Sequence, residues 1–122
     1  MKRVLDVGNC DADQAAIREL IESNFAAQVD RADQAADALR SLERAKYALV
    51  LVNRRLDCDD SDGMEVIRQI KGRPDFSGLP VMMITNFPEH QEAAQAAGAV
   101  EGFGKRSLGT EETLQRLRAY LV

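Results

Sequence analysis

Two apolar runs of strand length, YALVLV (47–52) and PVMMIT (80–85), place the strongest constraint on the fold of this chain. Neither run alternates with polar residues, so both faces of each strand are expected to be covered, as in a parallel sheet. Segments with helical spacing of apolar residues separate these runs from three weaker strand candidates. The expected strands are 4–7, 25–29, 47–52, 80–85 and 99–103, and the expected helices are 13–23, 33–44, 63–71, 88–97 and 110–121.

The regular alternation of strands and helices predicts an α/β domain. Short connections favour right-handed βαβ units, with helices on both faces of one parallel sheet. No linker, repeat or low-complexity segment interrupts the sequence, so residues 1–122 are expected to form a single domain. Ligands of such sheets bind at the carboxyl ends of the strands. These ends fall at residues 8–11, 53–55, 85–86 and 104–106.

The composition narrows the possible partners. A net charge of -4, with both signs mixed along the chain, gives no basic surface for nucleic acid. No apolar run approaches the roughly 18 residues of a membrane-spanning helix, and no charged start followed by an apolar segment marks a signal peptide. We therefore expect no nucleic-acid or membrane partner, and a cytoplasmic location.

Three stretches resemble the receiver domains of two-component response regulators. YALVLVNRRLDCDDSDGMEVIRQIK (47–71) is similar to the third strand, phosphoacceptor loop and third helix of that family. LPVMMITNF (79–87) resembles its fourth strand, and AGAVEGFGKRSL (97–108) its fifth strand and the loop that follows. The resemblance covers essentially the whole chain. It implies a flavodoxin-like five-stranded parallel sheet of order 2-1-3-4-5 and a signalling domain that is not an enzyme.

The resemblance also implies a site in which a hydroxyl and a Lys meet the oxygens of a phosphoryl group. Matched position by position, the hydroxyl belongs to Thr85 and the Lys is Lys105. The family's aromatic switch residue corresponds to Phe103. These three positions retain the residue types that the family uses.

Three acidic positions of the family are lost. The phosphoacceptor Asp corresponds to Asn53, and the acidic pair that holds Mg²⁺ falls on Gly8 and Asn9. An amide is a poor nucleophile and forms no acyl phosphate, while Mg²⁺ requires carboxylate oxygens together with phosphate and water. The chain is therefore identified as an atypical, pseudo-receiver member, with no cofactor and with weak or absent Mg²⁺ binding.

Two loops also depart from the family pattern. The interval from Asn53 to Gly63 is two residues longer than the family's usual spacing between acceptor and glycine. Arg106 stands where the family normally has Pro, often after a cis peptide bond. A cis bond before Arg would cost about 3 kcal/mol, so a trans bond is expected. The loop is then displaced, and Lys105 is predicted to miss the pocket.

Other acids offer an alternative acceptor. An ordinary phospho-accepting regulator with a rearranged site would use Asp11 or Asp57. The acidic segment 57–62 is otherwise a solvated turn in which Ser61 or Asp62 caps the next helix. A calcium loop is not expected, because the Gly and the closing Glu of that motif are misplaced.

Four further features either suggest another function or have no assigned role. VLDVG (4–8) resembles the start of S-adenosylmethionine-dependent methyltransferases, but a lone glycine turn is a weak motif. Cys10 and Cys58 both follow strands and would form a redox pair if they approached each other. His90 is expected on the surface. Asp6 interrupts a strand covered on both faces, so a raised pKa, a hydrogen-bond partner or unexpected exposure must accompany it.

The sequence as a whole favours a domain that works through protein contacts in a phosphorelay pathway. In the family, the fourth helix, fifth strand and fifth helix form the docking face. Here that face would consist of residues 88–97, Phe103 and residues 110–121. A histidine kinase or a downstream signalling protein is the expected kind of partner.

Overall fold

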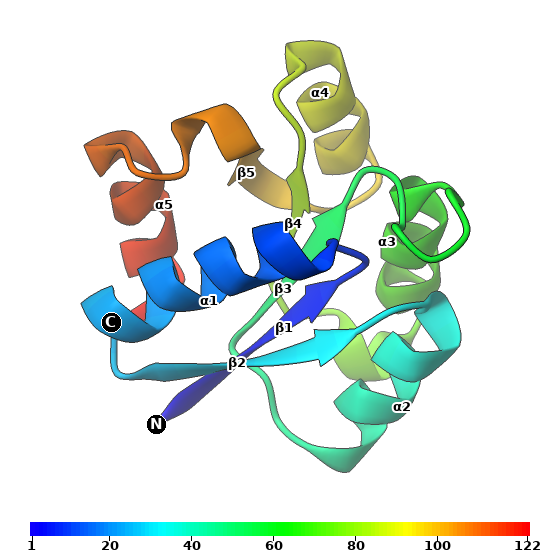
Figure 1. Ribbon diagram of the computed structural model, residues 1–122. Coiled ribbons are helices and arrows are strands. Elements are labelled where there is room, and N and C mark those ends of the chain that lie inside the picture. The colour runs from blue at the N-terminus through cyan, green and yellow to red at the C-terminus, as the bar shows by residue number, and fades with distance from the viewer.

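Five parallel strands form one sheet in the computed structural model, which describes residues 1–122 (Figure 1). Their order is β2-β1-β3-β4-β5, which confirms the flavodoxin-like arrangement predicted from the sequence. The strands are β1 (Lys2–Val7), β2 (Ala27–Ala32), β3 (Leu49–Asn53), β4 (Val81–Ile84) and β5 (Val100–Phe103).

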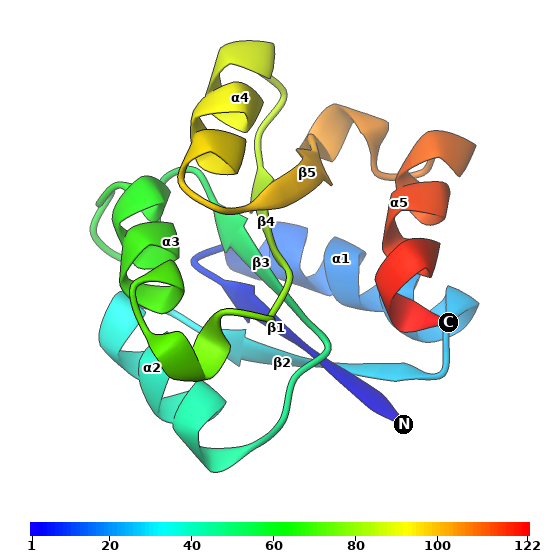
Figure 2. The same ribbon diagram turned by 180° about the vertical axis from the view of Figure 1, so that it is seen from behind.

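Five α-helices cover the two faces of the sheet, with α1 and α5 on one face and α2, α3 and α4 on the other (Figures 1 and 2). None of these helices is long and apolar enough to span a membrane. They are α1 (Asp11–Asn24), α2 (Ala35–Arg44), α3 (Gly63–Lys71), α4 (Pro88–Ala96) and α5 (Glu111–Leu121). Two short 3₁₀ helices, η1 (Pro74–Phe76) and η2 (Lys105–Ser107), lie in loops.

Strand β3 shows why the central strands lack polar alternation. Leu49 and Leu51 belong to the core beneath α1 and α5, whereas Val50 and Val52 belong to the core beneath α2 and α3. All four side chains are fully buried. Burial of each one contributes about 1.5 to 3 kcal/mol, so the run fixes β3 in the middle of the sheet.

Strand β2 differs from its predicted span, 25–29, because it pairs with β1 from Ala27 to Ala32. It lies at the edge of the sheet, and its polar residues Gln28 and Arg31 therefore reach solvent. The apolar pattern alone missed the second half of this strand. At the start of α3, the predicted cap is confirmed, because Asp62 accepts a hydrogen bond from the backbone N–H of Met64 (2.9 Å).

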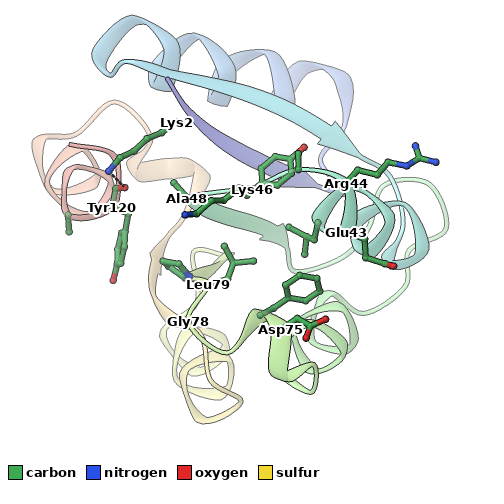
Figure 3. Close-up of a pocket in the computed structure, with 15 residues that line it drawn as sticks. Lys2, Glu43, Arg44, Lys46, Ala48, Asp75, Gly78, Leu79 and Tyr120 are labelled. Atoms are coloured by element: carbon green, nitrogen blue, oxygen red, sulfur yellow. Dashed lines mark hydrogen bonds between the residues drawn. The ribbon is translucent and has the colours of Figure 1, made fainter.

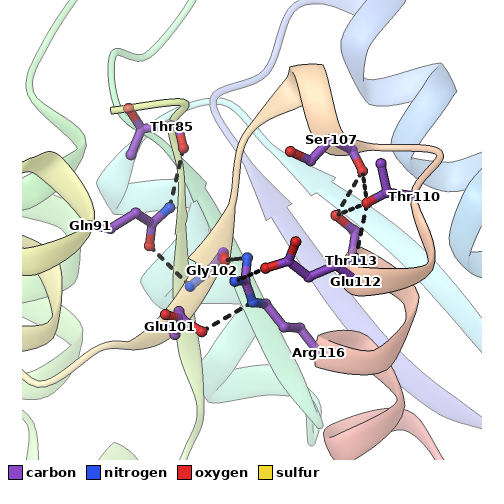
Figure 4. A network of polar contacts seen from close by, with 9 residues as sticks. All are labelled: Thr85, Gln91, Glu101, Gly102, Ser107, Thr110, Glu112, Thr113 and Arg116. Carbon is purple, nitrogen blue, oxygen red and sulfur yellow. Dashed lines mark hydrogen bonds and ion pairs between the residues drawn. The ribbon is translucent and has the colours of Figure 1, made fainter. Parts of the chain in front are cut away.

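Two of the surface hollows lie at opposite ends of the strands. An open groove of about 780 Å³ is found at the amino ends of β1, β3 and β4 (Figure 3). A more polar hollow of about 440 Å³ lies between α4, β5 and α5, and hydrogen bonds and ion pairs of side chains from these elements connect its walls (Figure 4). The first is remote from the carboxyl ends of the strands, and the second adjoins them.

Candidate functional site

Asn53 is the last residue of β3, at the carboxyl edge of the sheet, as the sequence predicted. Its side-chain Nδ2 donates to the carbonyl oxygen of Arg55 at 2.7 Å and to that of Gly8 at 3.5 Å. A carboxylate only accepts hydrogen bonds, so it would face these two carbonyl oxygens without a proton to offer. The local structure is therefore built around an amide.

Gly8 follows β1 in a left-handed conformation, with φ of 81°. A Cβ atom at this position would overlap Cδ2 of Leu56, whose side chain is buried. The carbonyl oxygen of Gly8 accepts a hydrogen bond from the backbone N–H of Asp57 at 2.8 Å. The loop after β3 thus packs over Gly8 and leaves no room for an acidic side chain there.

Asn9 turns its side chain inward, toward Asp6. Its Nδ2 donates to Oδ1 of Asp6 at 2.5 Å, and both side chains are buried. Oδ2 of Asp6 and Oδ1 of Asn9 have no hydrogen-bond partner. Burial raises the pKa of Asp6 to about 6, although the bond from Asn9 and the charges of Arg31 and Lys105 oppose the shift. Asp6 therefore has two of the features anticipated from the sequence, a partner and a raised pKa, and it is not exposed.

Lys105 extends toward α1. All peptide bonds are trans, as predicted for the bond before Arg106, and Lys105 begins the short helix η2. Its ammonium group pairs with Oδ2 of Asp13 at 2.7 Å, and this contact is the main reason that the pKa of Asp13 is lowered. No hydrogen bond links Lys105 to Asn53 or Thr85. The side chain therefore forms an ion pair with α1 and no hydrogen bond to either of these residues.

Thr85 follows β4 and belongs to a three-residue contact that the sequence did not reveal. Its hydroxyl lies 3.3 Å from Nδ1 of His90, and Nε2 of His90 accepts a hydrogen bond from Nε of Arg54 at 3.0 Å. His90 is half-buried, so it is less exposed than the predicted surface position implied. The ring spans the gap between β4 and the loop after β3, which no spacing within α4 could indicate.

The longer loop after β3 folds back on itself. Leu56 and Gly63 donate backbone hydrogen bonds to Ser61 and Arg54 at 2.9 and 2.7 Å. Asp60 supplies the left-handed residue of the turn, with φ of 59°. The two extra residues thus form a closed turn at the surface.

Both alternative acceptor acids are exposed. Asp57 lies in this loop. Asp11 begins α1 and pairs with Arg31 at 2.7 Å. Neither carboxylate has a hydrogen bond to Asn53 or Thr85.

The two cysteines contact different partners. Cys10 donates from Sγ to Oδ2 of Asp13 at 3.3 Å, and Cys58 donates to the carbonyl oxygen of Asp33 at 3.4 Å. Both thiols are free, and Cys58 is exposed.

The α4, β5 and α5 elements are held together by two long side chains (Figure 4). Gln91 of α4 donates to the carbonyl oxygens of Met83 and Thr85 and accepts from the N–H of Gly102. Arg116 of α5 donates to the carbonyl oxygen of Gly102 at 2.8 Å and pairs with acidic residues on β5 and α5, Glu101 and Glu112.

Two aromatic residues of this region are placed differently. Phe103, the expected switch aromatic, is only 2% exposed and packs in the core beneath α1 and α5. Phe87, immediately before α4, is 51% exposed. It is the apolar side chain that this part of the surface presents to solvent.

Comparison with known proteins agrees with this architecture. The response regulator receiver domain model matches residues 6–117. CheY4 of Vibrio cholerae is 18% identical, with a TM-score of 0.78 over 100% of this chain and 99% of that one. A putative response regulator from Chloroflexus aurantiacus is 20% identical, with a TM-score of 0.80 over 98% of both chains.

TrrA of Thermotoga maritima, solved in complex with Mg²⁺-BeF, is 20% identical, with a TM-score of 0.81 over 99% of this chain and 100% of that one. No curated protein is significantly similar to the chain. At these identities the solved structures show a common fold, and the family model adds the match along the sequence. The chain belongs to the response regulator receiver domain family.

Proposed function

We propose that the chain is a pseudo-receiver: a signalling domain that is not phosphorylated at the family's usual position and acts through protein contacts, without enzymatic activity of its own. The observation that carries this proposal is the pair of hydrogen bonds from Nδ2 of Asn53 to backbone carbonyl oxygens. They require a neutral donor at the strand end. An acyl phosphate requires a carboxylate at the same place.

The family's Mg²⁺ does not fit the residues present. Gly8 has no side chain, the amide group of Asn9 donates inward to Asp6, and that of Asn53 donates to the carbonyl oxygen of Arg55. No three His, Cys, Asp or Glu side chains lie together as metal ligands would. A hard divalent cation is held by several charged oxygens, so we expect weak or absent binding.

The proposed docking face comprises α4, β5 and α5. We propose that the protein acts in the cytoplasm. Exposed Phe87 offers an apolar anchor at its edge, and aromatic anchors of this kind dominate many interfaces. The hydrogen bonds of Gln91 and the hydrogen bond and ion pairs of Arg116 fix the positions of these three elements relative to one another. The partner we expect is a histidine kinase or a downstream signalling protein. Binding of this partner, and not the charge of a covalently attached phosphoryl group, would set the balance between the conformations of the domain.

Phosphorylation is tested by incubating the chain with Mg²⁺ and acetyl phosphate and measuring its intact mass. A second arm measures the melting temperature with Mg²⁺ and beryllofluoride, since a ligand that binds the folded state raises it. We expect no added phosphoryl group and no Mg²⁺-dependent shift. A receiver domain with an intact acceptor serves as positive control.

A gain of one phosphoryl mass would contradict the proposal. The variants Asp11→Asn and Asp57→Asn would then identify the acceptor, because loss of the mass gain in either one supports the ordinary regulator with a rearranged site. The docking face is tested separately, by comparing proteins captured from the native cell extract by the wild type and by Phe87→Ser. Equal capture of every partner would remove that face from the proposal.

A further inference from the structure

The open groove at the amino ends of the strands has an apolar floor. Half-buried side chains from the connections before β3 and β4 and from the end of α5 line it: Tyr47, Phe76, Leu79, Pro80 and Tyr120. Tyr47, Phe76 and Leu79 pack against one hydrophobic core of the protein, and Tyr120 packs against the other. The floor therefore rests on the fixed frame of the sheet, and its volume of about 780 Å³ is enough for several side chains of a ligand.

The acidic residues of the groove already have a cationic partner. Glu43 and Asp75 both pair with Arg73, at 3.9 and 3.6 Å. The guanidinium group of Arg73 also lies over the ring of Phe76, 5.1 Å from its centre. Two negative charges at one end of the groove are thus partly neutralised by a residue that is itself held in place.

The basic residues of the groove form fewer ion pairs than its acidic residues. Arg44 and Lys46 are exposed and take part in none of the ion pairs of the structure. The ammonium group of Lys2 donates only to the carbonyl oxygens of Tyr120 and Val122, at 3.2 and 3.3 Å. The unpaired positive charges of Arg44 and Lys46 contrast with the net charge of -4 of the chain.

We propose that this groove binds an extended acidic segment of a partner protein, whose carboxylates pair with Arg44 and Lys46 while an apolar side chain rests on the floor. The occupant follows from charge complementarity, because free cations beside apolar side chains match a segment that alternates acidic and apolar residues. Figure 3 shows Lys2, Lys46 and Arg44 spread from one side of the groove to the other, which suits several carboxylates along a chain better than one small anion.

This surface is independent of the proposed function. It lies at the amino ends of the strands, whereas Asn53 and the α4–β5–α5 face lie at or beside the carboxyl ends. A segment bound here would leave the other face free, so one domain could hold two proteins at once. Failure of the phosphorylation experiments would leave this proposal standing, and the reverse also holds.

The test uses a fluorescein-labelled eight-residue peptide with Glu at alternate positions and Leu and Phe between them. We expect saturable binding that weakens as salt is raised from low to physiological ionic strength, because exposed charge pairs are screened. The double variant Arg44→Glu/Lys46→Glu should bind at least about tenfold more weakly. Both positions are exposed, and a melting curve checks that the variant is folded.

Two controls separate the parts of the site. Arg68→Glu makes the same kind of charge reversal on α3, outside the groove, and should bind like the wild type. A peptide with Ser in place of Leu and Phe should lose most of the affinity, because the floor then has nothing to bury. No binding to the wild type, or equal weakening by Arg68→Glu and the double variant, would overturn the proposal.

Discussion

The ends of β1 and β3 lie side by side at the carboxyl edge of the sheet, yet only one of the two strands carries a carboxyl group there. β3 ends in Asn53, a neutral amide with its donor used, where the resemblance to the family places an acid. β1 carries an acid, Asp6, in the buried layer below the edge, with one oxygen unpartnered. An exposed carboxylate binds ligands, whereas a buried one mainly costs stability. The edge of the sheet thus carries a neutral amide at the end of β3, while the buried layer below it carries an acid that weakens the fold.

The largest effect is expected from placing an acid at the end of β1. Gly8→Asp should destabilise the protein by about 2 to 5 kcal/mol, since a left-handed residue costs roughly 1 to 2 kcal/mol and overpacking against Leu56 a further 1 to 3. Urea unfolding measures the loss. Gly8→Ala should lose nearly as much, which would show that the cost is steric. Gly78→Ala, where a Cβ meets nothing within 4 Å, should stay within about 0.5 kcal/mol of the wild type.

Removing the buried charge should have the next largest effect, in the opposite direction. The pKa of Asp6 is raised to about 6, so the folded state holds a proton that the unfolded chain releases at lower pH. Stability therefore falls as pH rises through this interval, and the cost is complete above pH 6. A shift of this size corresponds to roughly 3 kcal/mol as an upper bound. Asp6→Asn should add up to that amount at pH 8 and almost nothing at pH 3.5.

The pH dependence is what identifies the cause. Urea unfolding between pH 3.5 and pH 8 should show a declining curve for the wild type and a flatter one for Asp6→Asn. The new amide would also offer a donor to the unpartnered Oδ1 of Asn9. Asp57→Asn, an exposed acid at the same end of the molecule, should reproduce the wild-type decline. A constant difference at every pH would show that the carboxyl group is not the source.

At β3 the reverse exchange should destabilise the protein. Asn53→Asp removes the hydrogen bonds to the carbonyl oxygens of Arg55 and Gly8 and should cost about 2 kcal/mol at pH 7. The loss should shrink below pH 4, where a protonated carboxyl regains one donor. Asn86→Asp is the matched control: its Oδ1 accepts from the N–H of Arg106, a role that a carboxylate retains. Equal losses at the two positions would mean that the donor of Asn53 is unimportant.

More of the fold than of the candidate site could be predicted from the sequence. Leu49 to Val52 identified a central strand because burial on both faces leaves no polar residue in the pattern. The end of β2 was missed because an edge strand tolerates Arg31. The same pattern placed Gly8, Asn9 and Asn53 at strand ends, as the structure has them, whereas their correspondence to the family's acidic positions came only from the resemblance.

The contacts within the site were beyond the sequence. Arg54 and His90 are 36 residues apart and meet because β3 and β4 are neighbours in the sheet. The pair of Lys105 with Asp13 likewise joins the last loop to the first helix. Such contacts depend on side-chain directions set by the assembled fold, which periodicity does not encode. The one local contact predicted in this region, the cap by Asp62, lies within two residues of its partner.

The smallest effect is expected from Lys105, which extends from the loop after β5 to α1. Lys105→Met removes the ion pair with Asp13, in which both side chains are about one-third exposed, so the loss at pH 7 should stay below about 1 kcal/mol. The pKa of Asp13 is lowered chiefly by this contact, so the contribution of the ion pair is present at neutral pH and disappears as the pH falls through that lowered pKa.

Lys105 also lowers the pKa of Asp6, and its removal should therefore increase the cost of that buried charge above pH 6. In the background of Asp6→Asn the second part of the loss should vanish, and a double-mutant cycle at pH 8 measures the difference. Strict additivity of the two substitutions would show that the charge of Lys105 does not reach the buried layer, and that the edge and the interior of this sheet are electrostatically separate.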